Sequence, residues 1–247
     1  MLGVSSEFKY KNLLKSPEIQ IKQVGVQNNK IIGIAKLKYV EKQECPFLWY
    51  LTNGLKFSLI VGIDYTSSNL EYTNPHSLHY LSDSKQKLYE QAMIKSGSII
   101  SYFKPEQMLK LYGFGGILPK SHDVSHCFNV NFTNNPEVQG IENMVIAYRK
   151  SLKSVKLYGP TYFSHLIKKV LENSQGSQDQ NNNYYVLIIL TDGHIDDMRE
   201  TIDAIVEATS QPISIIIIGV GSSDFSNMVI LGKFIFLFVY LINFLRK

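Results

Sequence analysis

The sequence predicts an α/β fold with a doubly wound, mostly parallel sheet, preceded by a short N-terminal β segment. Three observations lead to this prediction. Apolar runs rich in Val and Ile occupy residues 56–63, 184–190 and 213–221, as is typical of strands buried on both faces. Stretches with helical periodicity separate these runs, which indicates strand–helix–strand crossovers. Hydrophobic residues make up 45% and charged residues 19% of the chain, so a packed core is expected.

The N-terminal β segment is predicted to contain two short strands, at residues 18–24 and 30–40, joined by a hairpin turn at "VQNNKI". Two strands cannot close a domain alone. The segment is therefore either a fragment of a β-sandwich or an edge ribbon on the domain that follows.

The rest of the chain alternates strands and helices. The helix predicted at residues 83–103 has Ser82 or Asp83 as its N-cap. The glycines of "YGFGG" lack the spacing of a phosphate-binding loop and predict a turn. The expected elements are strands at 56–63, 110–116, 184–190 and 213–221, helices at 83–103, 140–155, 163–174 and 196–210, and a polar loop at 174–183.

Two of the predicted strands end in an aspartate, at Asp64 and at Asp192. Ligands of such sheets gather beyond the carboxyl ends of the strands, so both acids are expected on one rim. Asp64, Thr66 and Ser68 follow D-x-T-x-S spacing, which lets alternate side chains converge. Carboxylate and hydroxyl oxygens suit Mg²⁺ or Mn²⁺. The alternative is that each acid caps the following helix. Because two acids occur together with hydroxyls at matching positions, a metal site is favoured over helix capping.

Charge and cysteine content exclude several classes of protein. The net charge is +4, and its Lys and Arg residues are scattered, so no nucleic-acid partner is expected. Cys45 and Cys127 lie far apart without metal-ligand spacing, which excludes a zinc finger or a disulfide framework. Free thiols suit a reducing, intracellular compartment. The N-terminus lacks the apolar core of a secretory signal, so none is expected.

Several motifs together resemble the von Willebrand factor A-type domain of the copine family: "GIDYTSSN", "SLHYL", "YGFGG", "SLKSVKLYGPTYF" and "LIILTDGHIDDM". The resemblance covers about residues 30 to 228 and implies a von Willebrand factor A-like, Rossmann-type fold. It also implies a metal ion-dependent adhesion site. The resemblance places the metal ligands at Asp64, Thr66, Ser68, Thr161 and Asp192, and Thr161 comes from the resemblance alone.

The resemblance also implies a domain organisation. Residues 1–50 are expected to be a remnant of a lipid-binding β-sandwich domain plus linker, residues 51–229 the A-type domain, and residues 230–247 an atypical hydrophobic tail. Copines carry two calcium-dependent lipid-binding domains before the A domain, and their aspartate-rich loops are absent here. Ca²⁺ is thus expected to act only through family domains missing from this chain.

The tail departs from the family pattern. Residues 234–245 are nearly all apolar but are short of the ~20 residues that a spanning helix needs. We expect the tail to pack on the domain in place of an edge strand or helix, or to be left exposed. The alternatives are a membrane anchor and a truncated or mistranslated gene product.

The resemblance implies a non-enzymatic, divalent-metal-dependent interaction module. Its expected partners are intracellular proteins that offer an acidic side chain. In the full-length family this activity is linked to calcium-dependent phospholipid binding and membrane signalling, so a cytoplasmic protein, peripheral at the plasma membrane, is expected. One alternative is a metal-dependent phosphatase-type hydrolase, but Thr66 stands where D-x-D-x-T enzymes have their second acid. Another is a RING ubiquitin-ligase relative, but two cysteines cannot form a RING.

Overall fold

The computed structural model describes residues 18–22, 31–36, 49–50, 53–82, 87–101, 108–176, 183–232 and 238–242. The chain divides into two compact units, Met1–Tyr50 and Leu51–Lys247. In the first unit, β1 (Glu18–Lys22) and β2 (Ile31–Lys36) pair antiparallel. This confirms the two predicted strands, while the turn predicted between them lies outside the described residues. That the unit is a remnant of a lipid-binding domain stays a prediction.

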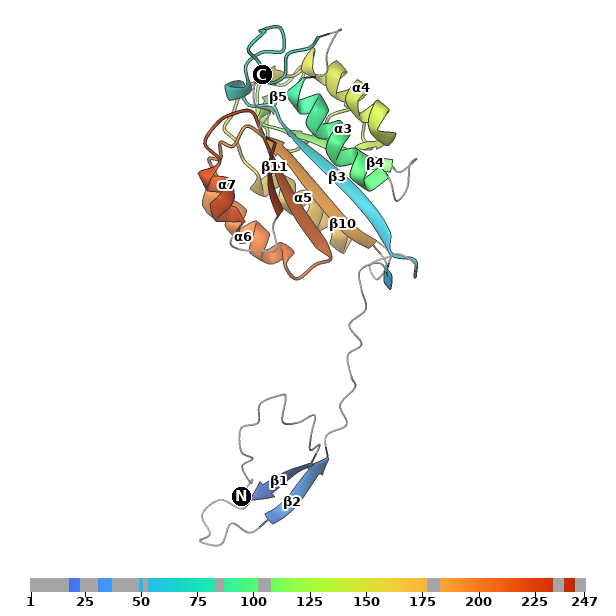
Figure 1. The fold of residues 1–247 in the computed structure, drawn as a ribbon. Helices are drawn as coiled ribbons and strands as arrows, with labels where there is room; N and C mark the ends of the chain where they lie inside the picture. The colour runs from blue at the N-terminus through green and yellow to red at the C-terminus, as the bar shows by residue number, and fades with distance from the viewer. Residues whose placement is uncertain are drawn as a thin grey trace. The chain divides into compact units, whose positions relative to one another are not determined.

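The second unit is built on a central sheet whose main strands are parallel (Figure 1). The neighbouring strands follow the order β12-β11-β10-β3-β4, and two short strands pair antiparallel with β4 at the far edge. The parallel strands are β3 (Lys56–Asp64), β4 (Met108–Phe114), β10 (Asn183–Thr191), β11 (Ile213–Val220) and β12 (Phe238–Ile242), and the antiparallel ones are β7 (Phe128–Asn129) and β8 (Glu137–Gln139).

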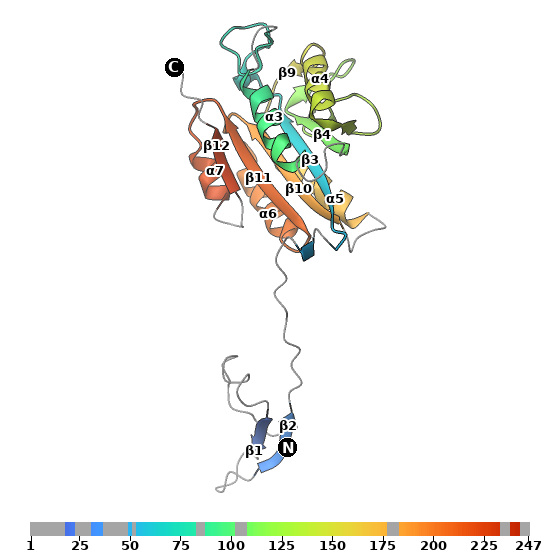
Figure 2. The same cartoon turned by 45° about the vertical axis from the view of Figure 1, so that its right-hand side comes forward.

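Helices cover both faces of this sheet, as Figures 1 and 2 show, so the doubly wound prediction is confirmed. One face carries α3 (Leu88–Ser101) and α4 (Gly140–Leu152). The other carries α5 (Ser164–Gln175), α6 (Met198–Ala208) and α7 (Ser226–Leu231). The described part of α3 begins at Leu88, so Ser82 is not its N-cap, and residues 83–86 lie outside the description.

Two hydrophobic cores result, and β3 separates them. Val61 packs into the core under α3 and α4, hereafter the α3/α4 core, and its neighbour Ile60 packs into the α5/α6/α7 core. The alternation follows from the two-residue repeat of a strand. The absence of a side chain at Gly62 gives room to Leu166 of α5, since a Cβ there would be 2.1 Å from Leu166 Cδ2. A side chain at position 62 would therefore displace the buried side chain of Leu166.

The hydrophobic tail contributes the outer strand of the sheet. β12 runs parallel to β11, with Ile216 opposite Phe238 and Val220 opposite Ile242. The expectation that the tail packs on the domain as an edge strand is thus confirmed for residues 238–242. Among the described residues, no helix combines the length and the apolarity that crossing a membrane requires.

Several short elements at the carboxyl end of β3 were not predicted. β5 (Gly116–Ile117), β6 (Val124–Ser125) and β9 (Lys156–Leu157) form a small separate sheet in the order β6-β5-β9. A short 3₁₀ helix occupies Ser67–Asn69. Thr66 forms an isolated parallel bridge with Tyr158, directly after β9. The small sheet therefore brings the segment after β9 to the end of β3.

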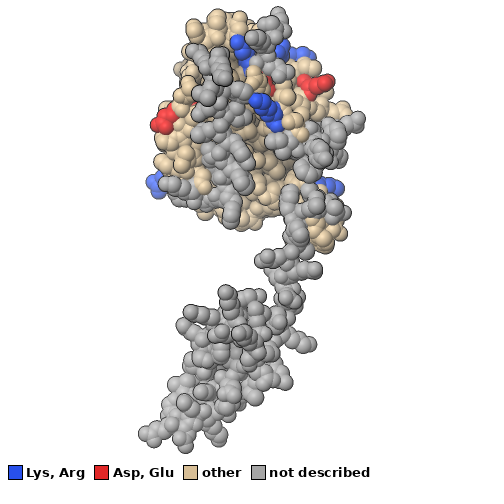
Figure 3. Space-filling model, viewed as in Figure 1, with Lys and Arg blue, Asp and Glu red and all other residues tan. Residues whose placement is uncertain are grey.

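Charges on the surface are of both signs. On the described part of the face in Figure 3, Lys and Arg side chains and Asp and Glu side chains are scattered among uncharged residues. That part of the face shows no continuous basic stripe of the kind that nucleic-acid binding requires.

Candidate metal centre

Three loops meet beyond the carboxyl ends of β3 and β10, and hydrogen bonds from backbone amides join them. The Ser67 amide donates to the carbonyl oxygen of Tyr158 at 2.8 Å. The Thr161 amide donates to Asp196 Oδ2 at 2.8 Å, and the Asp196 amide donates to the carbonyl oxygen of Thr161 at 2.9 Å. The loops at 65–70, 158–163 and 192–197 therefore form one rim.

Asp64 is the centre of this rim, and its carboxylate is completely buried. Oδ1 accepts hydrogen bonds from the amide and the hydroxyl of Thr66, at 2.9 and 2.6 Å. Oδ2 accepts one from the Thr191 hydroxyl at 2.8 Å. The Thr66 hydroxyl also lies 3.0 Å from that of Ser68. Because Ser68 is exposed, this cluster of oxygens reaches the surface.

Asp192 adds a second acid beside the first. It directly follows β10, which pairs with β3, and it is 4% exposed. Burial and the nearby Asp192 charge together raise the pKa of Asp64 to about 7. Among the described residues, the donors to the Asp64 carboxylate are all neutral groups. A buried charge of this kind is costly unless a cation compensates it.

The structure thus groups the predicted ligands to different degrees. Asp64, Thr66 and Ser68 are linked by direct hydrogen bonds, and Asp192 acts on Asp64 through its charge. Thr161 is buried on the loop that is bonded to both neighbouring loops.

A glycine allows the loops to approach Thr66. Gly115 has φ +77°, and a Cβ there would lie 2.4 Å from Thr66 Cγ2. Its carbonyl oxygen accepts a hydrogen bond from the Tyr158 amide at 3.1 Å. The turn predicted from "YGFGG" therefore lies beside the rim and leaves room for Thr66.

The chemistry of the donor set fits a hard divalent cation. Two carboxylates and three hydroxyls offer only oxygen, which Mg²⁺ and Mn²⁺ prefer, and these ions keep several waters. Among the described residues, no group of three or more His, Cys, Asp or Glu side chains could hold a metal. A centre built from the residues at this rim would combine carboxylate and hydroxyl oxygens. Its residues would be Asp64, Thr66, Ser68, Thr161 and Asp192.

The sequence did not predict the buried residues that form hydrogen bonds with Asp64 and Thr66. The ring of His79 is buried, and its Nε2–H donates to the carbonyl oxygen of Asp64 at 2.8 Å. The Asn69 side-chain amide donates to the carbonyl oxygen and the hydroxyl of Thr66, both at 3.3 Å. Thr191 was also missed, although the pairing of β10 with β3 places it beside Asp64. None of these contacts has a sequence spacing that reveals it.

Comparison with known proteins identifies the family. The copine family model matches residues 77–235, well over half of the chain. The chain belongs to the copine family. It is 38% identical over 214 residues to Copine-A of Dictyostelium discoideum, a match that covers 86% of this chain and 35% of that protein. This copine chain thus spans about a third of the length of Copine-A.

Solved structures agree on the fold. The von Willebrand factor type A protein from Catenulispora acidiphila matches with a TM-score of 0.50 at 11% identity, over 76% of this copine chain and 39% of that chain. The von Willebrand factor A domain of SpRpn10 matches with a TM-score of 0.50 at 11% identity, over 76% and 88%. The predicted von Willebrand factor A-like fold is therefore confirmed.

Proposed function

We propose that residues 51–229 form a non-enzymatic protein-interaction module that depends on Mg²⁺ or Mn²⁺. The ion would be held by the oxygens of Asp64, Thr66, Ser68, Thr161 and Asp192. When bound, it would supply a coordination position for an acidic side chain of an intracellular partner protein. The hydroxyls of Thr66 and Thr191 hold the Asp64 carboxylate in place, and the exposed Ser68 brings the centre to the surface.

The observation that carries this proposal is the buried Asp64 carboxylate, whose donors among the described residues are all neutral and which lies beside a second acid. Pure helix capping explains it less well. Asp197 shows what a capping acid looks like in this fold, since its carboxylate accepts hydrogen bonds from the Phe163 and Ser164 amides at the start of α5. Among the described residues, the Asp64 carboxylate accepts a backbone amide bond from Thr66 alone, before the short 3₁₀ helix.

The surface around the centre favours a protein partner. Ser67 and Ser68 are exposed. Leu70 and Tyr158 are exposed by 42% and 52%. When an acidic side chain of the partner reaches the centre, the partner residues around it would pack against these apolar groups. The interface would then include apolar contact area as well as one ionic bond.

Calcium-dependent phospholipid binding and membrane signalling are proposed only for the full-length family, through domains outside this chain. The proposal puts the protein in the cytoplasm, peripheral at the plasma membrane. The free thiol of Cys127 is in keeping with a reducing compartment.

The test is calorimetric titration of the purified chain with Mg²⁺ and with Mn²⁺. We expect binding at one site, and we expect Asp64→Ala to abolish it. Asp203→Ala, which removes an exposed acid from α6, is the matched control and should bind as wild type does. Unchanged binding in Asp64→Ala would reject the site assignment.

The hydrolase alternative makes the opposite prediction. A nucleophilic aspartate must reach its substrate, whereas Asp64 is fully buried and both of its carboxylate oxygens accept hydrogen bonds. Reproducible turnover of a phosphate ester that Asp64→Asn stops would favour the hydrolase over the interaction module.

A further inference from the structure

Two hydrogen-bonded chains run from α3 and α4 to the residues of the candidate metal centre. The first begins at Tyr148 on α4. Its hydroxyl lies 2.8 Å from His79 Nδ1, and His79 Nε2 lies 2.8 Å from the carbonyl oxygen of Asp64. A carbonyl oxygen only accepts, so Nε2 carries the proton, and the neutral ring accepts the Tyr148 proton at Nδ1. Every donor and acceptor in this chain is thereby assigned.

The second chain begins at Tyr89 on α3. Its hydroxyl donates to Asn69 Oδ1 at 2.9 Å, and the Asn69 amide donates to Thr66. The two chains also touch, since the rings of His79 and Tyr89 stack with their centroids 4.2 Å apart. Tyr89, His79 and Tyr148 are each at most 1% exposed.

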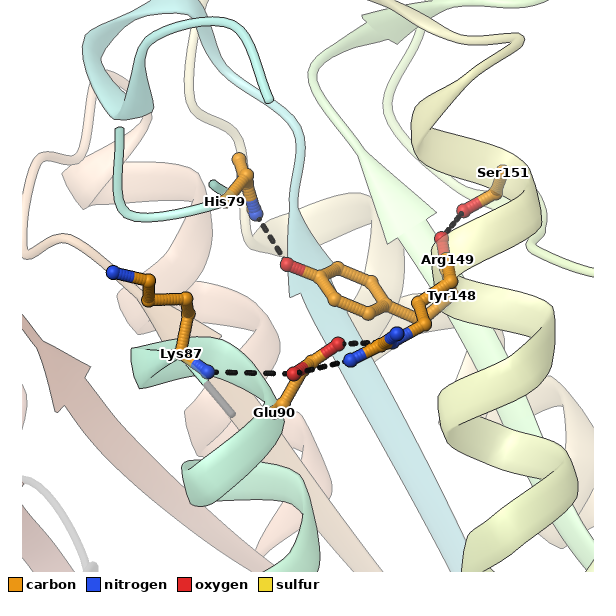
Figure 4. A network of polar contacts seen from close by, with 6 residues as sticks. All are labelled: His79, Lys87, Glu90, Tyr148, Arg149 and Ser151. Carbon is orange, nitrogen blue, oxygen red and sulfur yellow. Dashed lines mark hydrogen bonds and ion pairs between the residues drawn. The ribbon is translucent and has the colours of Figure 1, made fainter. Parts of the chain in front are cut away.

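An ion pair joins the two helices at the same level (Figure 4). Glu90 follows Tyr89, and Arg149 follows Tyr148. Arg149 Nε lies 2.5 Å from Glu90 Oε1, and Arg149 Nη2 lies 3.1 Å from Glu90 Oε2, which is a two-pronged contact. The Glu90 side chain is 2% exposed, while that of Arg149 is 37% exposed.

We propose that the Glu90–Arg149 ion pair is a positioning device for the metal centre. By fixing α3 against α4, it sets the positions of Tyr89 and Tyr148. These two residues then hold Thr66 and Asp64 through Asn69 and His79. The ion pair thus controls metal affinity from outside the centre, without touching the metal.

The geometry favours this role over simple bracing of two helices. A two-pronged Arg–carboxylate contact fixes direction as well as distance. Hydrogen bonds weaken steeply with misalignment, so a small shift of either helix would disturb the chains. Small displacements of the residues that coordinate a metal directly change the affinity for that metal, because the metal requires a specific ligand geometry. The inference rests on the proposed metal centre.

The main test variant removes both partners of the ion pair, Glu90→Leu with Arg149→Met. Removing both avoids a buried charge without a partner, which would destabilise the fold strongly. The matched control removes the exposed ion pair on α5, Lys169→Met with Glu172→Leu, whose atoms lie 3.0 Å apart on the other face of the sheet. Arg149→Lys is a third variant, which keeps the charge and loses the two-pronged geometry.

Two quantities are measured in all variants. Calorimetry gives the affinity for Mg²⁺, and nitrogen-15 NMR follows the His79 Nε2–H signal, which reports the bond to Asp64. We expect the double variant to bind Mg²⁺ roughly three- to tenfold more weakly, about 0.6–1.4 kcal/mol. Its ring signal should shift or exchange faster. Arg149→Lys should be intermediate, and the α5 control should match wild type.

The outcomes separate this inference from the proposed function. If wild type binds Mg²⁺ and the double variant matches it in affinity or in the ring signal, the inference is overturned, even when its melting temperature falls. If wild type binds neither Mg²⁺ nor Mn²⁺, the proposed function fails. In that case the ring signal alone decides whether the ion pair positions His79.

Discussion

The two cores on opposite faces of the sheet differ in chemistry. The α5/α6/α7 core is closed mainly by aliphatic side chains such as Leu166, Leu187 and Ile205, all completely buried. The α3/α4 core buries His79 and Tyr148 as well as aliphatic residues, and their polar atoms bond onward to Asp64. Apolar contact has no direction, whereas hydrogen bonds have one. We infer that the first core supports the sheet, while the second also orients the candidate centre.

The α5/α6/α7 side does contain one buried acid, which sharpens the comparison. Asp197 accepts hydrogen bonds from the Phe163 amide at 3.0 Å, the Ser164 amide at 2.9 Å and the Thr201 hydroxyl at 3.0 Å. These bonds join the starts of α5 and α6 and do not reach Asp64. A buried polar group on this face thus fixes helix ends rather than the site.

The largest expected effect on stability is on the apolar side. Leu166→Ala should lower the free energy of unfolding by about 2–5 kcal/mol, because it removes a fully buried side chain and leaves a cavity. Its affinity for Mg²⁺ should stay within about twofold of the wild-type value, below 0.5 kcal/mol. Urea unfolding and calorimetry measure the two quantities.

Val206→Ala on α6 is the control for that prediction, since Val206 is 52% exposed and should change neither quantity. If Leu166→Ala weakened metal binding as much as it weakened the fold, the two cores would not differ in their effect on the centre.

The second prediction concerns acid and the α3/α4 core. Burial lowers the pKa of His79 to about 3, whereas an exposed histidine titrates near 6.5. Between these values the unfolded chain binds more protons, so the His79 contribution to stability is present above about pH 6.5 and is lost as the pH falls. His79→Gln keeps a donor near Asp64 without a titrating ring. At pH 4.5 wild type should have lost about 2–3 kcal/mol of its free energy of unfolding through His79, and the variant should not show this loss.

The contribution of Asp64 to stability changes with pH in the opposite direction. The variant is therefore compared with wild type at each pH. Its raised pKa means that the folded chain binds more protons between about pH 4 and 7, and stability from Asp64 falls as pH rises. Unfolding is therefore measured with a chelator present. A pH profile of His79→Gln parallel to that of wild type would contradict the assignment of a neutral, buried His79.

Much of the fold was predictable because it follows from local patterns. The buried runs at β3, β10 and β11 and the helical periodicities of α4, α5 and α6 each predict an element without knowledge of its partners. The small sheet β6-β5-β9 was missed because its strands have only two residues each, too few to show a period. The start of α3 was placed too early because Ser82 resembles an N-cap.

The candidate site divides in the same way. Asp64, Thr66 and Ser68 were found from their spacing, and Asp192 from its place at a strand end. Thr161 required the family resemblance. The sequence could not predict the roles of His79, Tyr89 and Glu90. These roles depend on contacts with residues far along the chain, such as Arg149, which lies 59 positions after Glu90.

The smallest expected effect is a coupling energy within the α3/α4 core. Tyr148→Phe removes the hydroxyl that bonds to His79 Nδ1 and leaves that buried nitrogen without its donor. If the ion pair acts through Tyr148, then Tyr148→Phe and the Glu90→Leu, Arg149→Met double variant should not add in their effects on Mg²⁺ affinity. We expect a coupling of about 0.5–1 kcal/mol, as is usual for residues of one network.

The same cycle across the sheet gives the reference. Tyr148→Phe combined with Leu166→Ala should be additive within about 0.5 kcal/mol, because the two residues lie in different cores. Both cycles are measured by calorimetric titration with Mg²⁺. Equal coupling in the two cycles would mean that the affinity for Mg²⁺ depends on the stability of the whole fold rather than on the hydrogen bonds of α3 and α4. Coupling confined to the first cycle requires a directional path, and Tyr148–His79–Asp64 is the path that the distances provide.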